Sequence, residues 1–389
     1  MVLSKNKTKI LILTHYAFRA EEGEDTDQRI LRYLKDKVKK LVLITHPFPE
    51  FGYRYSYLTI YENGKKVRQI KIYVFKGPSL LQYLYHTILI YYFLLKVGFA
   101  FDLCIAMENL SFISVFPLRF INLFKRLVYY SFDFVPRRFQ NPILNWIYYF
   151  IYKFACKYSD TNWVMAKAQI EGNKLLGLNR FNSAPFSLVP IGYETKNINV
   201  LSADKVAFYN LVYAGGLRES YGPQLAIKAM PLLIKKFPKI RLTLIGVGKY
   251  ENQLKKLIND LKINKYVDFR GFIPSFKELT DTISQKSIGL APYAPIPGSN
   301  SFYSDPSKIK LYICCGLPVI TTKVTTIGSL LEKTNSGMVI DFSEQALCDA
   351  ITQLLGSKNK YKSYKDAAIK LSKRFDINHI MNIAIKKIP

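Results

Sequence analysis

The chain has 389 residues, 49% of them hydrophobic, and a formal net charge of +28 at pH 7, because 56 Lys and Arg outnumber 28 Asp and Glu. Length and hydrophobic content exclude a disordered chain and predict two or three folded domains, while five cysteines without a C-x-x-C pair or zinc-ligand spacing favour reduced thiols over disulfides or a metal site. The charge attracts nucleic acid, anionic membranes or phosphorylated substrates, but without a helix-turn-helix, RNP or zinc-finger pattern we expect no nucleic-acid partner.

Strand and helix patterns alternate from the start of the chain. We expect strands at Lys9–Thr14 and Leu41–Thr45 on either side of a surface helix at Asp27–Lys40. The apolar run Ile10–Leu13 lies within the first strand and is too short for a signal peptide, so none is expected. An Asn-Gly turn at Glu62–Lys65 predicts a β-hairpin. The hairpin strands and the later strands of this half are expected at Tyr55–Tyr61, Val67–Phe75, Asp102–Met107, Leu127–Ser131, Thr161–Met165 and Phe186–Pro190.

Two segments of the first half are apolar and aromatic, with basic residues nearby. Leu80–Leu95 carries no formal charge, and Trp146–Phe154 is almost wholly aromatic or aliphatic. The first segment is shorter than the roughly 20 residues that cross a bilayer, so we do not expect a spanning helix. Two interpretations remain open: a buried domain helix, or a helix that lies partly in an anionic membrane interface.

The second half alternates more cleanly. Strands around Val212, Leu242 and Val267 are separated by helices at Gln224–Lys236 and Glu251–Leu261. The alternation continues and predicts a doubly wound parallel sheet, whose ligand site lies beyond the carboxyl ends of its strands.

The most informative segment is Asp305–Thr322, with the sequence DPSKIKLYICCGLPVITT. Its first three residues are typical of a helix start, where free backbone N–H groups favour a phosphate. Lys308 and Lys310 add positive charge beside the helix dipole, and Gly316 ends the helix before a buried strand.

This segment resembles the donor-site signature of the retaining, nucleotide-sugar-dependent glycosyltransferases with the GT-B fold (family 4-like, group 1). Four further segments resemble the second domain of that family in the same order: Asn210–Arg218, Leu242–Gly248, Tyr266–Pro274 and Ser287–Tyr293. The resemblance is specific over roughly residues 205–345. Over residues 1–200 it rests on layout.

The resemblance implies an α/β chain with two Rossmann-like, doubly wound domains that face each other across a cleft. We place the acceptor domain at residues 1–197, the donor domain at 198–372, and a C-terminal helix that crosses back to the first domain at 373–389. It also implies transfer of a sugar, with retention, from a nucleoside diphosphate sugar to an acceptor hydroxyl, without a metal or other cofactor. We expect a lipid-linked or polysaccharide acceptor, and a cytoplasmic protein that is peripheral on the inner face of the plasma membrane.

Without a metal, the donor diphosphate needs cationic side chains and free N–H groups. Arg218 and Lys308 are the candidates for catalysis on this side, because neutralising the leaving phosphate weakens its bond to the sugar. Arg218 as an ordinary solvated residue and Phe272–Pro274 as a plain turn remain alternatives. The full expected donor site consists of Gly215, Gly216, Arg218, Gly246, Phe272, Ile273, Pro274, Tyr303, Asp305, Ser307 and Lys308.

For the acceptor we expect His15, Glu22 and Gly23, which follow the first strand, and Asp133, which follows a later one. Asp133 is also a candidate for catalysis, as the group that orients the acceptor hydroxyl or the sugar. A helix-capping role for Asp133 is the alternative.

The chain departs from the family pattern in the second-domain glycine loop, where Gly216 and Tyr221 stand in place of the common Arg and Lys, and at two further positions. Many relatives carry glutamates at the places held here by Tyr303 and Leu311, and the second glutamate contacts the ribose hydroxyls. Two other functions therefore stay open. One is a non-catalytic subunit that binds a glycan or a partner enzyme; the other, less favoured, is a nucleotide-sugar epimerase, which would need acid-base groups where only His15 is placed.

Overall fold

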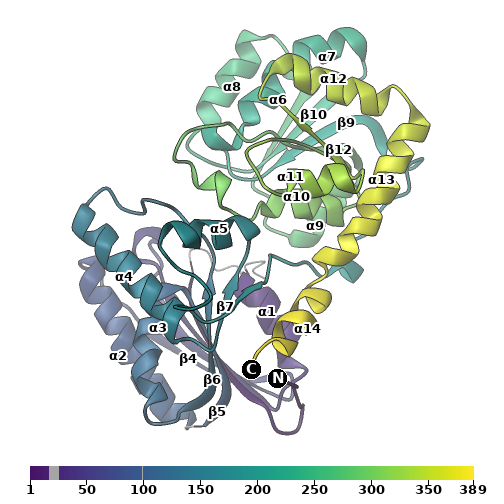
Figure 1. The fold of residues 1–389 in the computed structure, drawn as a ribbon. Helices are drawn as coiled ribbons and strands as arrows, with labels where there is room; N and C mark the ends of the chain where they lie inside the picture. The colour runs from purple at the N-terminus through teal and green to yellow at the C-terminus, as the bar shows by residue number, and fades with distance from the viewer. Residues whose placement is uncertain (17–25, 99) are drawn as a thin grey trace. The chain divides into compact units, whose positions relative to one another are not determined.

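The structure is a computed structural model that describes residues 1–16, 26–98 and 100–389. The chain forms two compact units, Met1–Pro190 with Ile380–Pro389 and Ile191–His379 (Figure 1). The predicted boundaries after residues 197 and 372 both fall inside the second unit.

The first unit is built on an eight-stranded sheet in the order β4-β3-β2-β1-β5-β6-β7-β8. Only the β2-β3-β4 pairings are antiparallel; the others are parallel. Each strand predicted for this half is present: β1 (Lys9–Tyr16), β2 (Lys40–Pro47), β3 (Tyr55–Glu62), β4 (Lys65–Tyr73), β5 (Phe101–Met107), β6 (Phe124–Ser131), β7 (Thr161–Val164) and β8 (Phe186–Leu188). The central strands β1 and β5 are almost wholly buried, which explains their continuous apolar runs.

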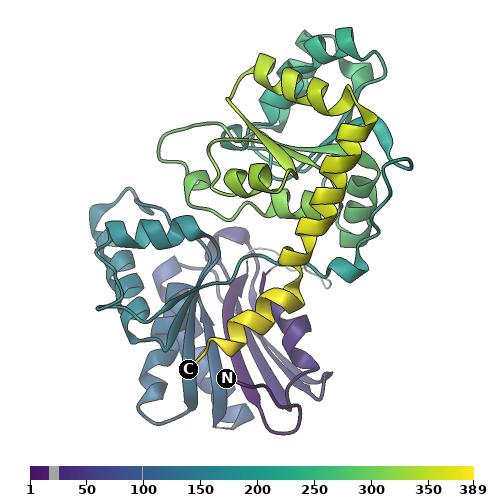
Figure 2. The ribbon, with the colours of Figure 1, turned by 45° about the vertical axis from the view of Figure 1, so that its right-hand side comes forward.

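Helices cover this sheet, and the chain returns to it at its end (Figures 1 and 2). Tyr33 donates a hydrogen bond to Asn382 at 2.5 Å, and Ile385 and Ile388 are buried. The helices are α1 (Thr26–Lys35), α2 (Ser79–Val97), α3 (Glu108–Val115), α4 (Pro142–Tyr158), α5 (Lys167–Leu175) and α14 (Ile377–Lys386), the last of which begins in the second unit.

Helix α2 fits neither interpretation of its sequence completely. It is long and apolar enough to cross a membrane, although core helices of soluble proteins also meet that criterion. Leu89 and Phe93 are buried, whereas Leu80, Ile88 and Leu95 are more than 60% exposed. One face of α2 therefore packs within the unit, and the other presents aliphatic side chains to the surroundings.

The second unit contains a six-stranded, all-parallel sheet in the order β11-β10-β9-β12-β13-β14. From β9 the chain adds strands on one side and then returns to the other side with β12, so the strand order reverses between β9 and β12. Ligands bind at such a switch point in doubly wound sheets. The strands are β9 (Ala207–Ala214), β10 (Arg241–Ile245), β11 (Val267–Gly271), β12 (Lys286–Ala291), β13 (Val319–Thr322) and β14 (Gly337–Ile340).

Helices pack on both faces of this sheet, over two separate apolar clusters. The single helix predicted over Gln224–Lys236 is interrupted at Ala229, because Pro231 cannot donate a hydrogen bond and its ring collides with the preceding turn. The helices are α6 (Pro223–Lys228), α7 (Met230–Lys236), α8 (Glu251–Asp260), α9 (Phe276–Ser284), α10 (Ser307–Cys314), α11 (Gly328–Lys333), α12 (Glu344–Leu355) and α13 (Lys358–Ser372).

Candidate functional site

Glycine loops bring three backbones together at the carboxyl edge of the second sheet. The Gly215 amide donates to Ile245 at 2.9 Å, and the Gly246 amide donates to Gly271 at 2.7 Å. A Cβ atom on Gly246, whose φ is 136°, would lie 2.0 Å from the Gly215 carbonyl oxygen. Only glycine fits there, so these loops form a smooth backbone surface open to close approach by a ligand.

Lys308 reaches this surface from α10 and is held in a cage of tyrosines. Its Nζ donates to the Tyr213 hydroxyl at 2.9 Å. The same atom lies 4.3, 4.8 and 4.7 Å from the ring centres of Tyr213, Tyr221 and Tyr293. The Lys308 Cε would lie 3.0 Å from a Cβ atom on Gly215, so the missing side chain there makes room for the lysine.

The cage leaves the lysine without a counter-charge. Lys308 is only 7% exposed, and no carboxylate pairs with it in the described part of the chain. Burial lowers the pKa of Lys308 to about 7. Aromatic faces stabilise a cation but do not neutralise it, so the site favours an anion that would restore the ammonium form.

The start of α10 supplies further positive potential. Its N-cap residue is Pro306, and no side chain caps the first turn, where Ser307 is exposed. Uncapped N–H groups and the helix dipole favour a phosphate. Asp305 does not cap the helix as its position suggested.

Asp305 instead forms a buried ion pair with Lys310 and accepts a hydrogen bond from the Ile191 amide at 2.8 Å. Both ion-pair side chains are about 95% buried. Asp305 and Lys310 therefore brace the loop before α10, and of the two lysines in the motif Lys308 is the one that faces the glycine loops.

Arg218 lies beside the cage and remains exposed. Its guanidinium carbon is 5.6 Å from the ring centre of Tyr221, the same ring that contacts Lys308. The structure thus brings Arg218 and Lys308 together around one tyrosine, with Gly215 next to Lys308.

The remaining predicted donor residues differ in how far their side chains are exposed. Phe272, at the end of β11, is 67% exposed, and Pro274 is also exposed, while Ile273 and Tyr303 are half-buried. Leu311 is 7% exposed and belongs to an apolar core cluster of this unit. The position at which many relatives carry a glutamate is thus occupied here by a leucine that packs in the core.

Among the expected acceptor residues, Glu22 and Gly23 lie outside the described residues. His15 is described, and it is buried together with His46 and His86. The ring centres in this histidine cluster are 4.7 to 5.5 Å apart, and among the described residues no hydrogen-bond partner faces either ring nitrogen of His15 or His86. No group of three or more His, Cys, Asp or Glu among the described residues is arranged to hold a metal ion.

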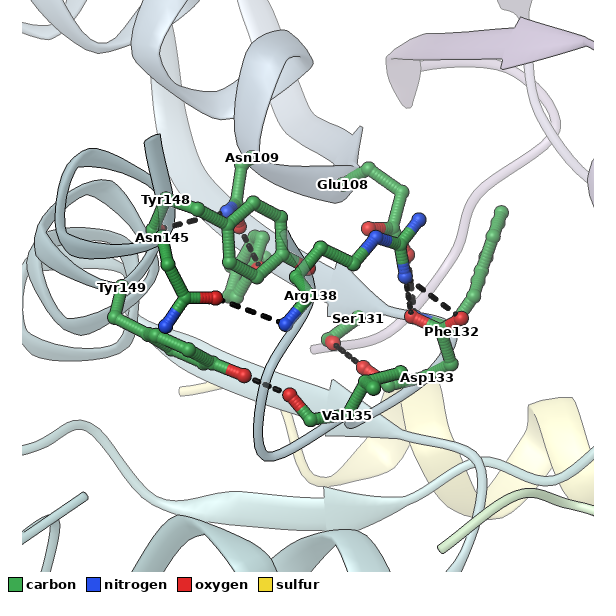
Figure 3. Close-up of polar contacts among 11 residues, drawn as sticks. Glu108, Asn109, Ser131, Phe132, Asp133, Val135, Arg138, Asn145, Tyr148 and Tyr149 are labelled. Carbon is green, nitrogen blue, oxygen red and sulfur yellow. Dashed lines mark hydrogen bonds and ion pairs between the residues drawn. The ribbon is translucent and has the colours of Figure 1, made fainter. Parts of the chain in front are cut away.

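Asp133 belongs to a second polar cluster, at the carboxyl ends of β5 and β6 (Figure 3). Both of its carboxylate oxygens accept hydrogen bonds from Arg138 Nη1, at 2.7 and 2.9 Å. Asp133 does not cap the following helix, because Asn141 caps α4. Glu108 lies beside this pair and accepts a hydrogen bond from the Phe132 amide at 2.6 Å.

Glu108 was not predicted from the sequence. It directly follows β5 and has a φ of 68°, a left-handed conformation that costs energy for a side chain of this size. Such strain is found most often at functional sites. The signal in the sequence was a glutamate at the end of an apolar strand, the same signal that led to Asp133.

The two carboxyl groups of this cluster have different surroundings. Burial and the nearby Asp133 raise the pKa of Glu108 to about 8, while the Phe132 amide and Arg138 act in the opposite direction. Asp133 is paired with the Arg138 guanidinium. The pair thus offers a hydrogen-bond donor and an acceptor next to each other, an arrangement that can orient a hydroxyl.

The histidine cluster predicts a loss of stability in mild acid. Burial, and for His15 also the neighbouring His86, lower the folded-state pKa values to about 3 for His15 and about 4 for His86, against 6.5 when unfolded. The unfolded chain therefore takes up protons first as pH falls below 6.5, and each histidine then costs up to about 1.4 kcal/mol of unfolding free energy per pH unit.

We expect His86→Phe to reduce the loss of unfolding free energy between pH 6.5 and 4, measured by urea denaturation. The exposed His379→Gln is the matched control and should leave the slope unchanged. Equal slopes in His86→Phe and the wild type would show that His86 is already charged in the folded protein.

Comparisons with known proteins fit this layout. Residues 203–371 match the family model "Glycosyl transferases group 1". WcaL of Escherichia coli (strain K12), provisionally named a colanic acid biosynthesis glycosyltransferase, is 23% identical over 173 residues, which are 44% of this chain and 41% of WcaL. MJ1059 of Methanocaldococcus jannaschii, an uncharacterized glycosyltransferase, is 26% identical over 247 residues, which cover 56% of this chain and 59% of MJ1059. Each alignment spans less than two thirds of the relative.

Solved structures share the fold over nearly the whole chain. Sucrose-phosphate synthase from Thermosynechococcus elongatus has a TM-score of 0.69 at 14% identity and covers 98% of this chain and 99% of its own. Anabaena HepE in complex with UDP-glucose has a TM-score of 0.69 at 16% identity, with the same coverage. Residues 203–371, in the second unit, thus form a group 1 glycosyltransferase domain, and the chain has the GT-B fold throughout.

Proposed function

We propose that this protein transfers a sugar, with retention, from a nucleoside diphosphate sugar to an acceptor hydroxyl. The observation that carries the proposal is Lys308, a buried lysine at the switch point of a parallel sheet that has no counter-charge among the described residues. A diphosphate supplies the missing negative charge. HepE, which is similar in fold, was solved with UDP-glucose, and this supports the same class of donor here.

In this proposal Lys308, Arg218 and the start of α10 share the charge that develops on the leaving diphosphate. The backbone at Gly215, Gly216 and Gly246 lets the phosphates approach closely. Because three sources of positive potential surround the phosphates, the proposed transfer needs no metal.

The acceptor hydroxyl is oriented by Asp133 and Glu108 in the first unit. Asp133, held by Arg138, accepts a hydrogen bond from the hydroxyl, and Glu108 donates one to a neighbouring oxygen while it is protonated. Retention fits a transfer in which the leaving phosphate itself receives the acceptor proton, so no enzyme nucleophile is required.

The acceptor class we propose is a lipid-linked sugar or a growing polysaccharide, as in the synthesis of a surface polysaccharide, lipopolysaccharide or glycolipid. Exposed aliphatic and aromatic side chains on α2 and α4, together with the charge of +28, favour attachment to the anionic inner face of the plasma membrane. The name of WcaL refers to colanic acid biosynthesis, which supports a polysaccharide acceptor.

A specific observation keeps one alternative in view. Leu311 is packed in the core and offers no group to the ribose hydroxyls, which favours a binding subunit without activity. An epimerase is disfavoured, because His15 is buried with its pKa lowered to about 3 and cannot serve as an acid at neutral pH.

The proposal predicts that one nucleotide class stabilises the protein. In a thermal-shift panel of UDP-, GDP-, ADP- and dTDP-linked sugars, a ligand at 100 times its Kd adds about 2.7 kcal/mol to stability. Release of free nucleoside diphosphate from the responding donor would separate an enzyme from a binding subunit. A folded protein that responds to none of the four would contradict the proposed donor site.

We expect Lys308→Met to weaken donor binding by about 1.5 to 3 kcal/mol, because it removes a charge-assisted phosphate contact while keeping an unbranched side chain of similar size. Isothermal titration with the responding donor measures the change. Lys255→Met, which removes an exposed lysine paired with Glu251 on α8, is the matched control and should keep the wild-type Kd. An unaltered Kd in Lys308→Met would remove this lysine from the donor site.

Donor binding should also take up a proton. Burial lowers the pKa of Lys308 to about 7, so most of this lysine is neutral at pH 8 and becomes protonated when a diphosphate binds. Titrations at pH 8 in buffers of different ionisation enthalpy should show uptake approaching one proton. In Lys308→Met that uptake should vanish, and its persistence would assign the proton to another group.

The membrane part of the proposal predicts salt-sensitive attachment. Liposomes with anionic lipid should sediment the protein at low ionic strength and release most of it at high salt, because salt screens surface charges. Vesicles of uncharged lipid are the control. Equal sedimentation with both vesicle types would reject the electrostatic contribution.

A further inference from the structure

The first unit contains a pocket of about 690 Å³ along one face of α4. Its helical lining residues follow the spacing of a single helix face, and the loop before α4 and the end of α5 complete the rim. The lining consists of Pro136, Arg137, Pro142, Asn145, Trp146, Tyr149, Phe150, Lys153 and Leu176.

The apolar part of this α4 pocket is aromatic and exposed. Trp146 and Phe150 stack with ring centres 5.6 Å apart, and they are 66% and 58% exposed. Ile143 and Leu144 on the same helix are also more than half exposed. Apolar surface of this kind favours a hydrocarbon ligand, because burying it removes unfavourable contact with water.

The polar part of the pocket has one sign of charge. Arg137 and Lys153 line it, and none of the nine lining residues is acidic. Neither cation forms an ion pair within the part of the chain that the structure describes; Arg137 donates to the Gln140 carbonyl oxygen at 2.9 Å. A ligand that satisfies both parts must carry an anionic head and an apolar tail.

The loop that carries Arg137 is fixed against α4 before any ligand binds. The Asn145 side chain accepts hydrogen bonds from the amides of Arg138 and Phe139, at 2.9 and 3.2 Å. The Tyr149 hydroxyl donates to the Val135 carbonyl oxygen. The wall is thus preorganised, which lowers the entropy lost on binding.

We propose that this α4 pocket binds a single lipid phosphate, with the phosphate between Arg137 and Lys153 and the hydrocarbon chain on Trp146 and Phe150. The inference rests on the proposed acceptor class and specifies it as a molecule whose lipid is joined to its sugar through phosphate. Arg137 is followed directly by Arg138, which holds Asp133. One short segment therefore borders both the pocket and the group proposed to orient the acceptor hydroxyl.

Tryptophan fluorescence gives a direct test in the full chain. The protein has two tryptophans, and since Trp163 is fully buried, a ligand in the pocket should change the emission of Trp146. We expect farnesyl phosphate, below its aggregation concentration, to give a saturable single-site change. Farnesol, which lacks the phosphate, should bind about tenfold more weakly or worse, and inorganic phosphate alone should give no change.

The double variant Arg137→Gln/Lys153→Gln should weaken farnesyl phosphate binding by about 10- to 100-fold and keep Trp146 in place. Lys157→Gln, an exposed lysine one turn further along α4 that does not line the pocket, is the matched control and should bind as the wild type does.

Farnesol binding as tightly as the phosphate, or full affinity in the double variant, would overturn the inference. An emission change only with anionic vesicles would also overturn it and make this face a general membrane contact. The assay contains no sugar nucleotide, so its result is independent of whether the donor site works.

Discussion

The burial of the Lys308 side chain among three tyrosine rings is the interaction on which the proposed donor site depends. An unpaired cation in a protein interior is costly unless a partner arrives, and the lowered pKa of this lysine expresses that cost. The faces of the three tyrosine rings attract the cation and so reduce this cost, and they do not compete with Lys308 for an anionic ligand. The site thereby favours a ligand that brings negative charge.

Much of the second unit serves to present this lysine. Gly215 lacks a side chain at the place that Lys308 occupies, and Tyr213 belongs to strand β9 of the sheet. The ion pair between Asp305 and Lys310 braces the turn before α10 from the buried side. Lys310 is thus paired with the Asp305 carboxylate, whereas Lys308, two residues earlier, has no paired carboxylate among the described residues.

The strands and most helices were predictable because their apolar periodicity reports local burial. The break at Ala229 followed from Pro231, which the pattern of apolar residues alone does not register. Lys308 was predictable from its motif. Its cage was not, because Tyr213, Tyr221 and Tyr293 come from separate segments.

Sequence position also suggested the wrong role for Asp305 and gave no indication of a role for Glu108. Asp305 has the right residue type for a helix cap, yet the nearby Lys310 competes successfully for it in the interior. Glu108 escaped notice because its importance arises from a backbone conformation and from Asp133, which lies 25 positions along the chain by residue number. Residue types and spacing do not encode such tertiary contacts, so the cluster of Glu108 with Asp133 and Arg138 could not be predicted.

The return of the chain to its first unit makes the second unit an insertion in the topological sense. Residues Ile380–Pro389 belong to the first unit, and Ile380, Met381 and Ile385 bury their side chains. During synthesis the second unit, whose residues are contiguous, has all of its sequence before the first one does. The half of the protein that emerges first from the ribosome is therefore the half that completes its core last.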